Sequence, residues 1–106
     1  MPEPFQLSEE AVLDLDAIWL YLLNREGRAT ADRIIEKIFE GFHRLAENPE
    51  IGHRRADLTT RPVLFYRIFS YLVIYVPGSK PLQVLAVLHG RRNVQRLLRA
   101  RSEVHE

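Results

Sequence analysis

Three apolar runs separated by short breaks fill residues 62–93 and constrain the fold more than any other part of the chain. The runs are Val63–Ile68, Tyr71–Val76 and Leu82–Leu88. They are rich in Val, Ile, Phe and Tyr, which suit a pleated sheet. Pro77–Pro81 separates the last two runs with Pro and Gly, which favour a turn. Because breaks this short join antiparallel strands, the sequence predicts a three-stranded antiparallel meander.

A helix is expected before the sheet over residues 9–24. Ser8 precedes it and offers a side-chain oxygen for the N-cap, and Gly27 follows it as a helix breaker. The apolar residues recur at helical spacing on one side. We expect this face to meet the sheet; it consists of Ala11, Val12, Leu15, Ile18, Trp19 and Leu22.

A second helix is expected over residues 31–47. Thr30 is the capping residue that the sequence suggests, and Pro49 ends the helix because the residue before a proline avoids the helical conformation. The short link predicts an antiparallel helical hairpin. Its apolar face, with Ile34, Ile38 and Phe42, is expected to be buried with Trp19 against the sheet.

The first helix also carries a second, narrower apolar stripe on its opposite side, formed by Leu13, Ala17 and Leu20. A helix with one buried face does not need such a stripe. Two interpretations are open: the helix is covered on two sides, or the stripe is a docking surface.

Two short segments complete the expected fold. Residues 5–7 alternate apolar and polar side chains, as an edge strand of the sheet does, and residues 94–98 suit one or two helical turns with Arg96, Arg99 and Arg101 pointing outward. The prediction is a single α+β domain over residues 1–106, with an ordered core over about 5–98. Its order is β-α-α-β-β-β, with the helical hairpin on one face of a small antiparallel sheet.

Composition supports a globular domain and excludes some chemistry. Hydrophobic residues make up 46% and charged residues 27% of the chain, an ordinary globular balance. The absence of cysteine excludes disulfides and thiolate metal sites. No apolar run approaches the roughly 20 residues of a membrane span, and the N-terminus lacks a signal-peptide pattern. We therefore expect a cytoplasmic protein without a membrane partner.

Charge divides sharply along the chain, although the net charge is only +1. Residues 1–51 hold 5 basic and 11 acidic residues, a net of −6, and residues 52–106 hold 10 basic and 3 acidic residues, a net of +7. Such a division fits a surface that meets an anionic partner. It fits equally two helices that carry acidic residues on their solvent faces.

No standard catalytic or nucleotide-binding motif is present. His43, His53, His89 and His105 lack metal-ligand spacing, so no metal site is expected. His89 ends the last strand just before Gly90. It suits either an acid or base near neutral pH or a structural hydrogen bond at the strand end.

Arginines flank the predicted meander on both sides. Their guanidinium groups suit phosphate or carboxylate recognition. The alternative is a solubilising rim around a small sheet. The group consists of Arg54, Arg55, Arg61, Arg67, Arg91 and Arg92.

Four segments resemble the ParE branch of the RelE/ParE toxin superfamily. They are Leu7–Leu22, Arg44–Leu58, Tyr71–Val76 and Val84–Asn93. The first carries Leu-Ser, an acidic-Leu-acidic pattern and Ile-Trp-x-Tyr. The second keeps a Pro and a Gly followed by Arg, and the last contains His-Gly-Arg-Arg. Because the four occur in order and with matching spacing over about residues 5–98, together they are more specific than any one motif.

The resemblance implies the toxin of a bacterial type II toxin–antitoxin module, which uses no cofactor. It implies a cognate antitoxin that wraps the toxin, forms a hetero-oligomer with it and binds operator DNA. The ParE branch implies inhibition of DNA gyrase. The RelE branch implies an enzyme that cuts mRNA on the ribosome.

The sequence departs from the nuclease pattern of the RelE branch. Lys37 and Lys80 are its only lysines, and no tyrosine follows Tyr75. The toxin is therefore expected to act by binding rather than as an enzyme. His89 as acid or base, with Arg67 and Arg91 as phosphate clamps, is the alternative catalytic set.

The sequence also departs from the usual ParE pattern. Phe69 and Ser70 replace the glycine expected at the turn before the second strand, and Val76 stands where arginine is frequent. The expected function is still a ParE-type gyrase inhibitor. The alternatives are an mRNA endonuclease and an inactive relative that binds only its antitoxin.

Two groups of binding residues follow from this interpretation. Leu13, Ala17 and Leu20 are expected to meet the antitoxin. The residues expected to meet the target are His89, Arg91, Arg92, Arg54, Arg55 and Arg61.

Overall fold

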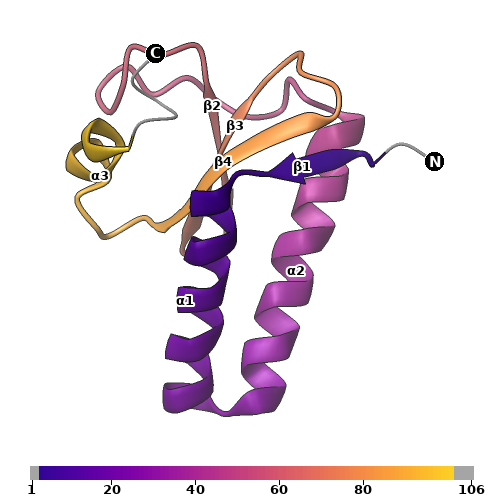
Figure 1. The fold of residues 1–106 in the computed structure, drawn as a ribbon, viewed down its shortest axis with the longest axis vertical. Coiled ribbons are helices and arrows are strands. Elements are labelled where there is room, and N and C mark those ends of the chain that lie inside the picture. The colour runs from indigo at the N-terminus through magenta and orange to yellow at the C-terminus, as the bar shows by residue number, and fades with distance from the viewer. Residues whose placement is uncertain (1–2, 102–106) are drawn as a thin grey trace.

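The computed structural model describes residues 3–101, which form a four-stranded sheet and three helices (Figure 1). The expected α+β class, the order β-α-α-β-β-β and the short final helix are confirmed. The elements are β1 (Phe5–Leu7), α1 (Glu9–Glu26), α2 (Arg28–Glu47), β2 (Leu64–Ile68), β3 (Tyr71–Val76), β4 (Leu82–His89) and α3 (Val94–Ala100).

The sheet has the strand order β1-β4-β3-β2. Strands β2, β3 and β4 form the predicted antiparallel meander, in which Tyr71 lies opposite both Ile68 and His89. Strand β1 is the predicted edge strand, but it runs parallel to β4, with Phe5 opposite Leu82. The sheet is therefore mixed rather than wholly antiparallel. The long connection from β1 to β4, which contains both helices and two strands, permits this parallel pair, whereas a short hairpin would not.

The helices α1 and α2 lie side by side and extend beyond the sheet as an antiparallel hairpin (Figure 1). Ser8 caps α1 as predicted, since its Oγ accepts a hydrogen bond from the Ala11 amide at 3.0 Å. The expected start of α2 after Thr30 is wrong: the helix begins at Arg28. Gly27, at φ 94°, both ends α1 and precedes α2. A glycine adopts this backbone conformation readily, so a tighter link than predicted is feasible.

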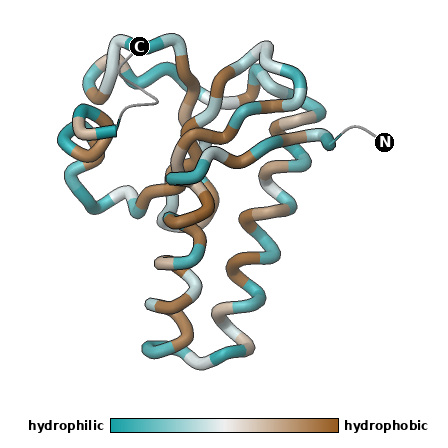
Figure 2. Tube along the Cα trace, in the orientation of Figure 1, coloured by the Kyte–Doolittle hydropathy of each residue, from teal (hydrophilic) through white to brown (hydrophobic). Residues whose placement is uncertain are grey.

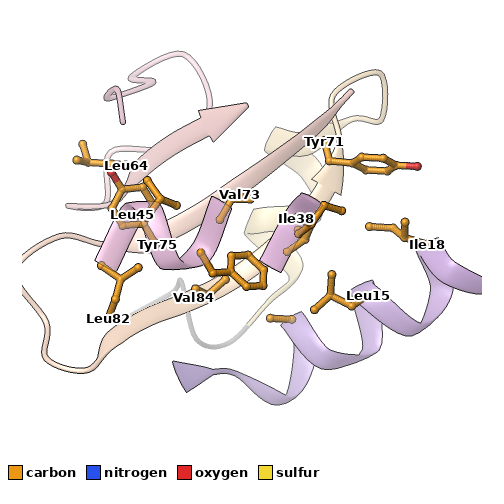
Figure 3. Packing of buried hydrophobic residues seen from close by; sticks show 13 residues of the cluster. Leu15, Ile18, Ile38, Leu45, Leu64, Tyr71, Val73, Tyr75, Leu82 and Val84 are labelled. Atoms are coloured by element: carbon orange, nitrogen blue, oxygen red, sulfur yellow. The ribbon is translucent and has the colours of Figure 1, made fainter. Parts of the chain in front are cut away.

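One face of the sheet is covered by this hairpin (Figure 3). Ile38 and Phe42 of α2 are fully buried in one cluster with Val73, Tyr75 and Val84 of the sheet, as predicted. Burial of each such side chain contributes about 1.5–3 kcal/mol. Figure 2 shows the strands as the most continuous hydrophobic segments, whereas α2 alternates between hydrophobic and hydrophilic residues.

Trp19 is not a core residue, contrary to the prediction. It is half-buried, and its Nε1–H donates to Asp32 Oδ1 on α2 at 2.8 Å. An indole N–H needs a polar partner, and the rim of the hairpin supplies one where the sheet face does not. Ile34 is likewise only half-buried at the edge of the cluster, and Val12 is exposed.

The segment of residues 48–63 crosses from the hairpin side to the opposite face of the sheet. Its start is anchored by Tyr75, whose Oη donates to the Pro49 carbonyl at 2.7 Å and accepts from the Gly52 amide at 3.0 Å. A Cβ atom on Gly52 would lie 2.5 Å from that Oη, so this close approach requires glycine. His53 then pairs with Phe65 on the outer edge of β2.

The opposite face of the sheet carries a second, smaller core beneath the 48–63 segment and α3. Alternate residues of the strands point to it, since side chains alternate between the faces of a sheet. Its buried members are Val63, Phe65, Leu72, Ile74, Ala86, Leu88, Val94 and Leu98.

Arg101 joins the end of this second face back to α1. Its guanidinium forms two hydrogen bonds of 2.8 Å with the Asp14 carboxylate, and Nε lies 3.1 Å from Glu10 Oε1. Asp14 Oδ2 also accepts a hydrogen bond from the amide of Val87, which lies on β4 past the part of that strand that pairs with β1. We call this arrangement the Asp14 clasp. The prediction that Arg101 points outward is therefore wrong, because the carboxylate holds it beside α1 with its side chain only 16% exposed.

Candidate functional site

A groove of about 530 Å³ lies between α1 and the end of the sheet. Its walls come from segments far apart in sequence. Helix α1 supplies an apolar wall, the sheet supplies a floor, and the turn after β4 supplies a basic rim. We call it the α1–β4 groove, and its lining residues are Asp14, Ala17, Ile18, Tyr21, Tyr71, Val87, Leu88, His89, Arg91 and Arg92.

His89 occupies the end of β4 in this groove and is half-buried. Its ring packs edge-on against the Tyr71 ring with centroids 5.4 Å apart. Its Nδ1 accepts a hydrogen bond from the Arg91 amide at 3.0 Å. A neutral ring with Nδ1 as acceptor carries its proton on Nε2. The geometry thus presents a hydrogen-bond donor to the groove and leaves no unoccupied basic nitrogen on the neutral ring.

The Tyr71 hydroxyl beside His89 is held in its neutral form. Burial is the main cause that raises the pKa of Tyr71 above its ordinary value, and the proximity of Tyr21 adds to the effect. Tyr71 therefore adds no charge to the groove at neutral pH, and Asp14 of α1 and the two arginines of the rim are charged residues of its lining. Arg91 and Arg92 are both exposed there.

The second apolar stripe of α1 is exposed in the structure. Leu13 is 65% and Leu20 53% exposed, and Ala17 is also exposed. Within residues 3–101 no element covers it, so the interpretation that the helix is covered on both sides is wrong. Tyr21, 54% exposed, continues the stripe, although the sequence analysis did not include it. Its position four residues after Ala17 was the signal that could have placed it there.

Five arginines line two adjoining hollows on the opposite face of the sheet. Arg55, Arg67 and Arg92 line one of about 310 Å³, and Arg61 and Arg99 line the next, of about 290 Å³. We call these the basic hollows. Arg92 also lines the α1–β4 groove, so the turn after β4 serves both sides.

Arg54 and Arg55 differ in their surroundings although they are neighbours in sequence. Arg54 is exposed and lines neither hollow. Arg55 forms a two-pronged pair with Asp57 at 2.9 and 2.8 Å. The hydrogen bonds of this pair are the main cause that raises the pKa of Arg55 and lowers that of Asp57.

Arg67 and His89, the alternative catalytic set, line different hollows. Arg67 lies opposite Leu72 in the ladder, whereas His89 lies opposite Tyr71. Consecutive residues of a strand point to opposite faces, so the two side chains leave the sheet on opposite sides. The structure does not bring them into one pocket.

Phe69 is a candidate functional residue that the sequence analysis noted only as a departure from the family pattern. It forms the turn between β2 and β3, with φ 55° and its side chain 52% exposed. A bulky residue rarely adopts positive φ, at a cost of about 1–2 kcal/mol. Conformations of this cost cluster at functional sites. The Gly90 amide donates to the carbonyl of the neighbouring Ser70 at 2.8 Å, which ties this turn to the turn after His89.

Residues 3–101 contain no cluster of three or more His, Cys, Asp or Glu side chains that could hold a metal ion. None of their helices combines the length and apolarity needed to cross a bilayer.

Comparison with known proteins defines the family. The model for the ParE toxin of the type II toxin–antitoxin system parDE matches residues 5–94. Toxin ParE3 of Caulobacter vibrioides is 33% identical over 84 residues, which cover 76% of this chain and 80% of that protein. A solved chain described as the chromosomal ParDE system from P. aeruginosa has the same fold. Its TM-score is 0.69 at 20% identity, covering 80% of this chain and 92% of that chain.

The extent of the family match decides the assignment. The chain belongs to the family of ParE toxins of type II toxin–antitoxin systems. The family resemblance inferred from the four sequence segments is thereby confirmed.

Proposed function

We propose that this ParE-family toxin acts in the cytoplasm, where a cognate antitoxin neutralises it and DNA gyrase is its target. The observation that carries the proposal is the α1–β4 groove. It joins the exposed apolar stripe of α1 to the basic rim after β4, so one continuous surface offers both an apolar and a cationic contact. Family membership supports the antitoxin as partner.

The antitoxin is expected to lay an amphipathic segment along the stripe of Leu13, Ala17, Leu20 and Tyr21. These residues repeat at helical spacing and present the apolar anchors that the helix-in-groove mode requires. The result would be a toxin–antitoxin hetero-oligomer in which the antitoxin contacts operator DNA.

A charge placed in the stripe tests the antitoxin contact. Leu20→Glu should weaken antitoxin binding by about tenfold or more, because a carboxylate would be desolvated at an apolar contact. Ile51→Glu is the matched control, since Ile51 is also an exposed apolar residue but lies in the 48–63 segment. Unchanged affinity of the Leu20 variant, measured by calorimetry on a folded protein, would remove the stripe from the proposed interface.

The target is expected to contact the rim of the groove. Arg91→Ala combined with Arg92→Ala should abolish toxicity while the protein stays folded, because both guanidinium groups are exposed and available for charge-assisted bonds. His89→Ala should reduce toxicity less completely. Arg33→Ala on the exposed side of α2 is the control. Undiminished toxicity of the double variant would overturn this assignment.

The type of target is tested by inducing the gene alone in cells and measuring gyrase supercoiling and mRNA cleavage side by side. Loss of supercoiling with intact mRNA is the expected result. Cleaved mRNA, abolished by His89→Ala alone, would establish the endonuclease alternative. The absence of both effects and of any growth defect would establish the inactive relative.

A further inference from the structure

We propose that the face carrying the basic hollows binds nucleic acid through its phosphates, as an activity separate from the α1–β4 groove. Charge is the first observation. Residues 53–67 contain four arginines and one aspartate, and residues 89–100 contain four arginines and no acid, for a net of +7. Residues 9–47, which include the hairpin, contain five basic and nine acidic residues, for a net of −4.

The fold gathers five of these eight arginines at the two basic hollows. The two basic hollows share Leu58 and Gln95 as lining residues, so they adjoin beside α3. Together they are lined by five guanidinium groups, of which Arg55 is already paired with Asp57. Thr59 and Thr60 add hydroxyl groups to the hollow of Arg61 and Arg99. The arginines are Arg55, Arg61, Arg67, Arg92 and Arg99.

The space for Arg67 is shaped by the backbone. A Cβ atom on Gly90 would lie 3.3 Å from Arg67 Nη2 and 3.4 Å from the Ser70 carbonyl. The glycine therefore leaves room for the guanidinium at the end of the sheet. Arg67 itself is exposed and lines the hollow beside Arg92.

The lining favours a phosphate backbone over an acidic protein. Protein interfaces have an apolar centre within a polar rim. The exposed large apolar side chains of residues 3–101 are Val12, Leu13, Leu20, Tyr21, Ile51 and Phe69, and none of them lines a basic hollow. Several guanidinium groups with threonine hydroxyls in one of the two hollows instead suit phosphates, which accept from both kinds of donor.

Fluorescence anisotropy with the full chain tests this inference without gyrase or antitoxin. One arm uses a short labelled DNA duplex and the other a single-stranded RNA of the same length, so the tighter arm identifies the source of the phosphates. Binding should weaken steeply with salt, because each phosphate contact releases about one counterion. Since no gyrase is present, this result stands or fails separately from the proposed function.

The decisive variant is Arg67→Ala combined with Arg99→Ala, which removes one guanidinium from each hollow. We expect binding about tenfold weaker or more and a salt slope reduced by about 1–2. The control is Arg28→Ala with Arg33→Ala on the exposed side of α2. Thermal melts of both variants should match the wild type, because all four side chains are exposed.

Three outcomes would overturn the proposal. They are the absence of salt-dependent binding in both arms, an equal loss in the control variant, and displacement of the nucleic acid by poly-glutamate at the same concentration of charge. The last result would identify the surface as one for acidic polypeptides.

Discussion

The two faces of the sheet use the same strands in different ways. The hairpin face packs two long helices over a cluster of 13 buried residues, and its helices carry net negative charge. The other face packs an irregular segment and the seven-residue α3 over a cluster of 8, and it carries the five arginines of the basic hollows. The larger core contributes more free energy of folding because burial energy scales with apolar area. Stability and cationic surface are thus assigned to opposite sides of one sheet.

The largest expected difference between the faces is the loss in free energy of unfolding when a buried side chain of each core is replaced by alanine. Phe42→Ala, on the hairpin face, should lower the free energy of unfolding by about 3–5 kcal/mol, since Phe42 is fully buried in the larger cluster. Leu98→Ala, on the other face, should cost about 2–3 kcal/mol, near the lower limit for such a change. Denaturant unfolding measures both. An equal or greater loss for Leu98→Ala would break the comparison.

The next difference concerns the ion pairs. Arg101→Ala should cost about 2–3 kcal/mol, because the Asp14 carboxylate is only 10% exposed and would lose its charged partner. Arg55→Ala removes an equally short pair with Asp57, but these side chains are 41% and 63% exposed, so solvent screens the pair and a clearly smaller loss is expected. Both arginines bind their aspartate through two short hydrogen bonds, but Arg101 also contacts Glu10, so the two melting curves compare a buried cluster with an exposed pair. Similar losses would show that burial is not what distinguishes the pairs.

A smaller effect appears at high pH on the hairpin face. Burial raises the pKa of both Tyr71 and Tyr75 above the ordinary value of 10. The unfolded chain therefore releases these protons first, and deprotonation favours unfolding. The stabilisation is complete below about pH 10 and is lost as pH rises through the folded-state pKa, by at most about 1.4 kcal/mol per pH unit and tyrosine. The free energy of unfolding of the Tyr71→Phe variant should fall less steeply as pH rises. A stability that stays constant above pH 10 would contradict the placement.

The smallest expected change in stability is at the turn that joins β2 to β3. Phe69→Gly should be more stable than Phe69→Ala by about 1 kcal/mol, because only glycine adopts φ 55° without strain. If the exposed ring serves target binding, both variants should lose toxicity equally. A glycine variant that keeps full toxicity would show that the ring at the sheet end is dispensable.

The hairpin face could be predicted from sequence because periodic patterns report it. The helices, the meander and the burial of Phe42 all follow from local spacing. The segments that cover the other face are held by pairs distant in the chain, such as Gly52 with Tyr75 and Arg101 with Asp14, which leave no periodic signal. Trp19 was wrongly predicted to be a core residue, because helical spacing does not reveal its hydrogen bond to Asp32 on α2.

The candidate site shows the same limit. Residue type identified the arginines and His89 as candidate binding residues. Which of them line the groove and which line the hollows depends on strand register. That division could have been anticipated in part, since adjacent residues of one strand point to opposite faces. The path of the 48–63 segment, which brings Arg55 into the same hollow as Arg67, could not have been predicted from the sequence.

The pairing of β1 with β4 has a consequence for how the protein is made. Residues 5–7 find their partners at residues 82–84, and Asp14 finds its partner at Arg101. The helical hairpin leaves the ribosome first, but the sheet that it covers is completed only when β4 emerges. Contacts this distant in sequence form slowly. The α1–β4 groove therefore cannot form in a nascent chain that lacks β4. Synthesis that stops before residue 89 releases a product without the groove.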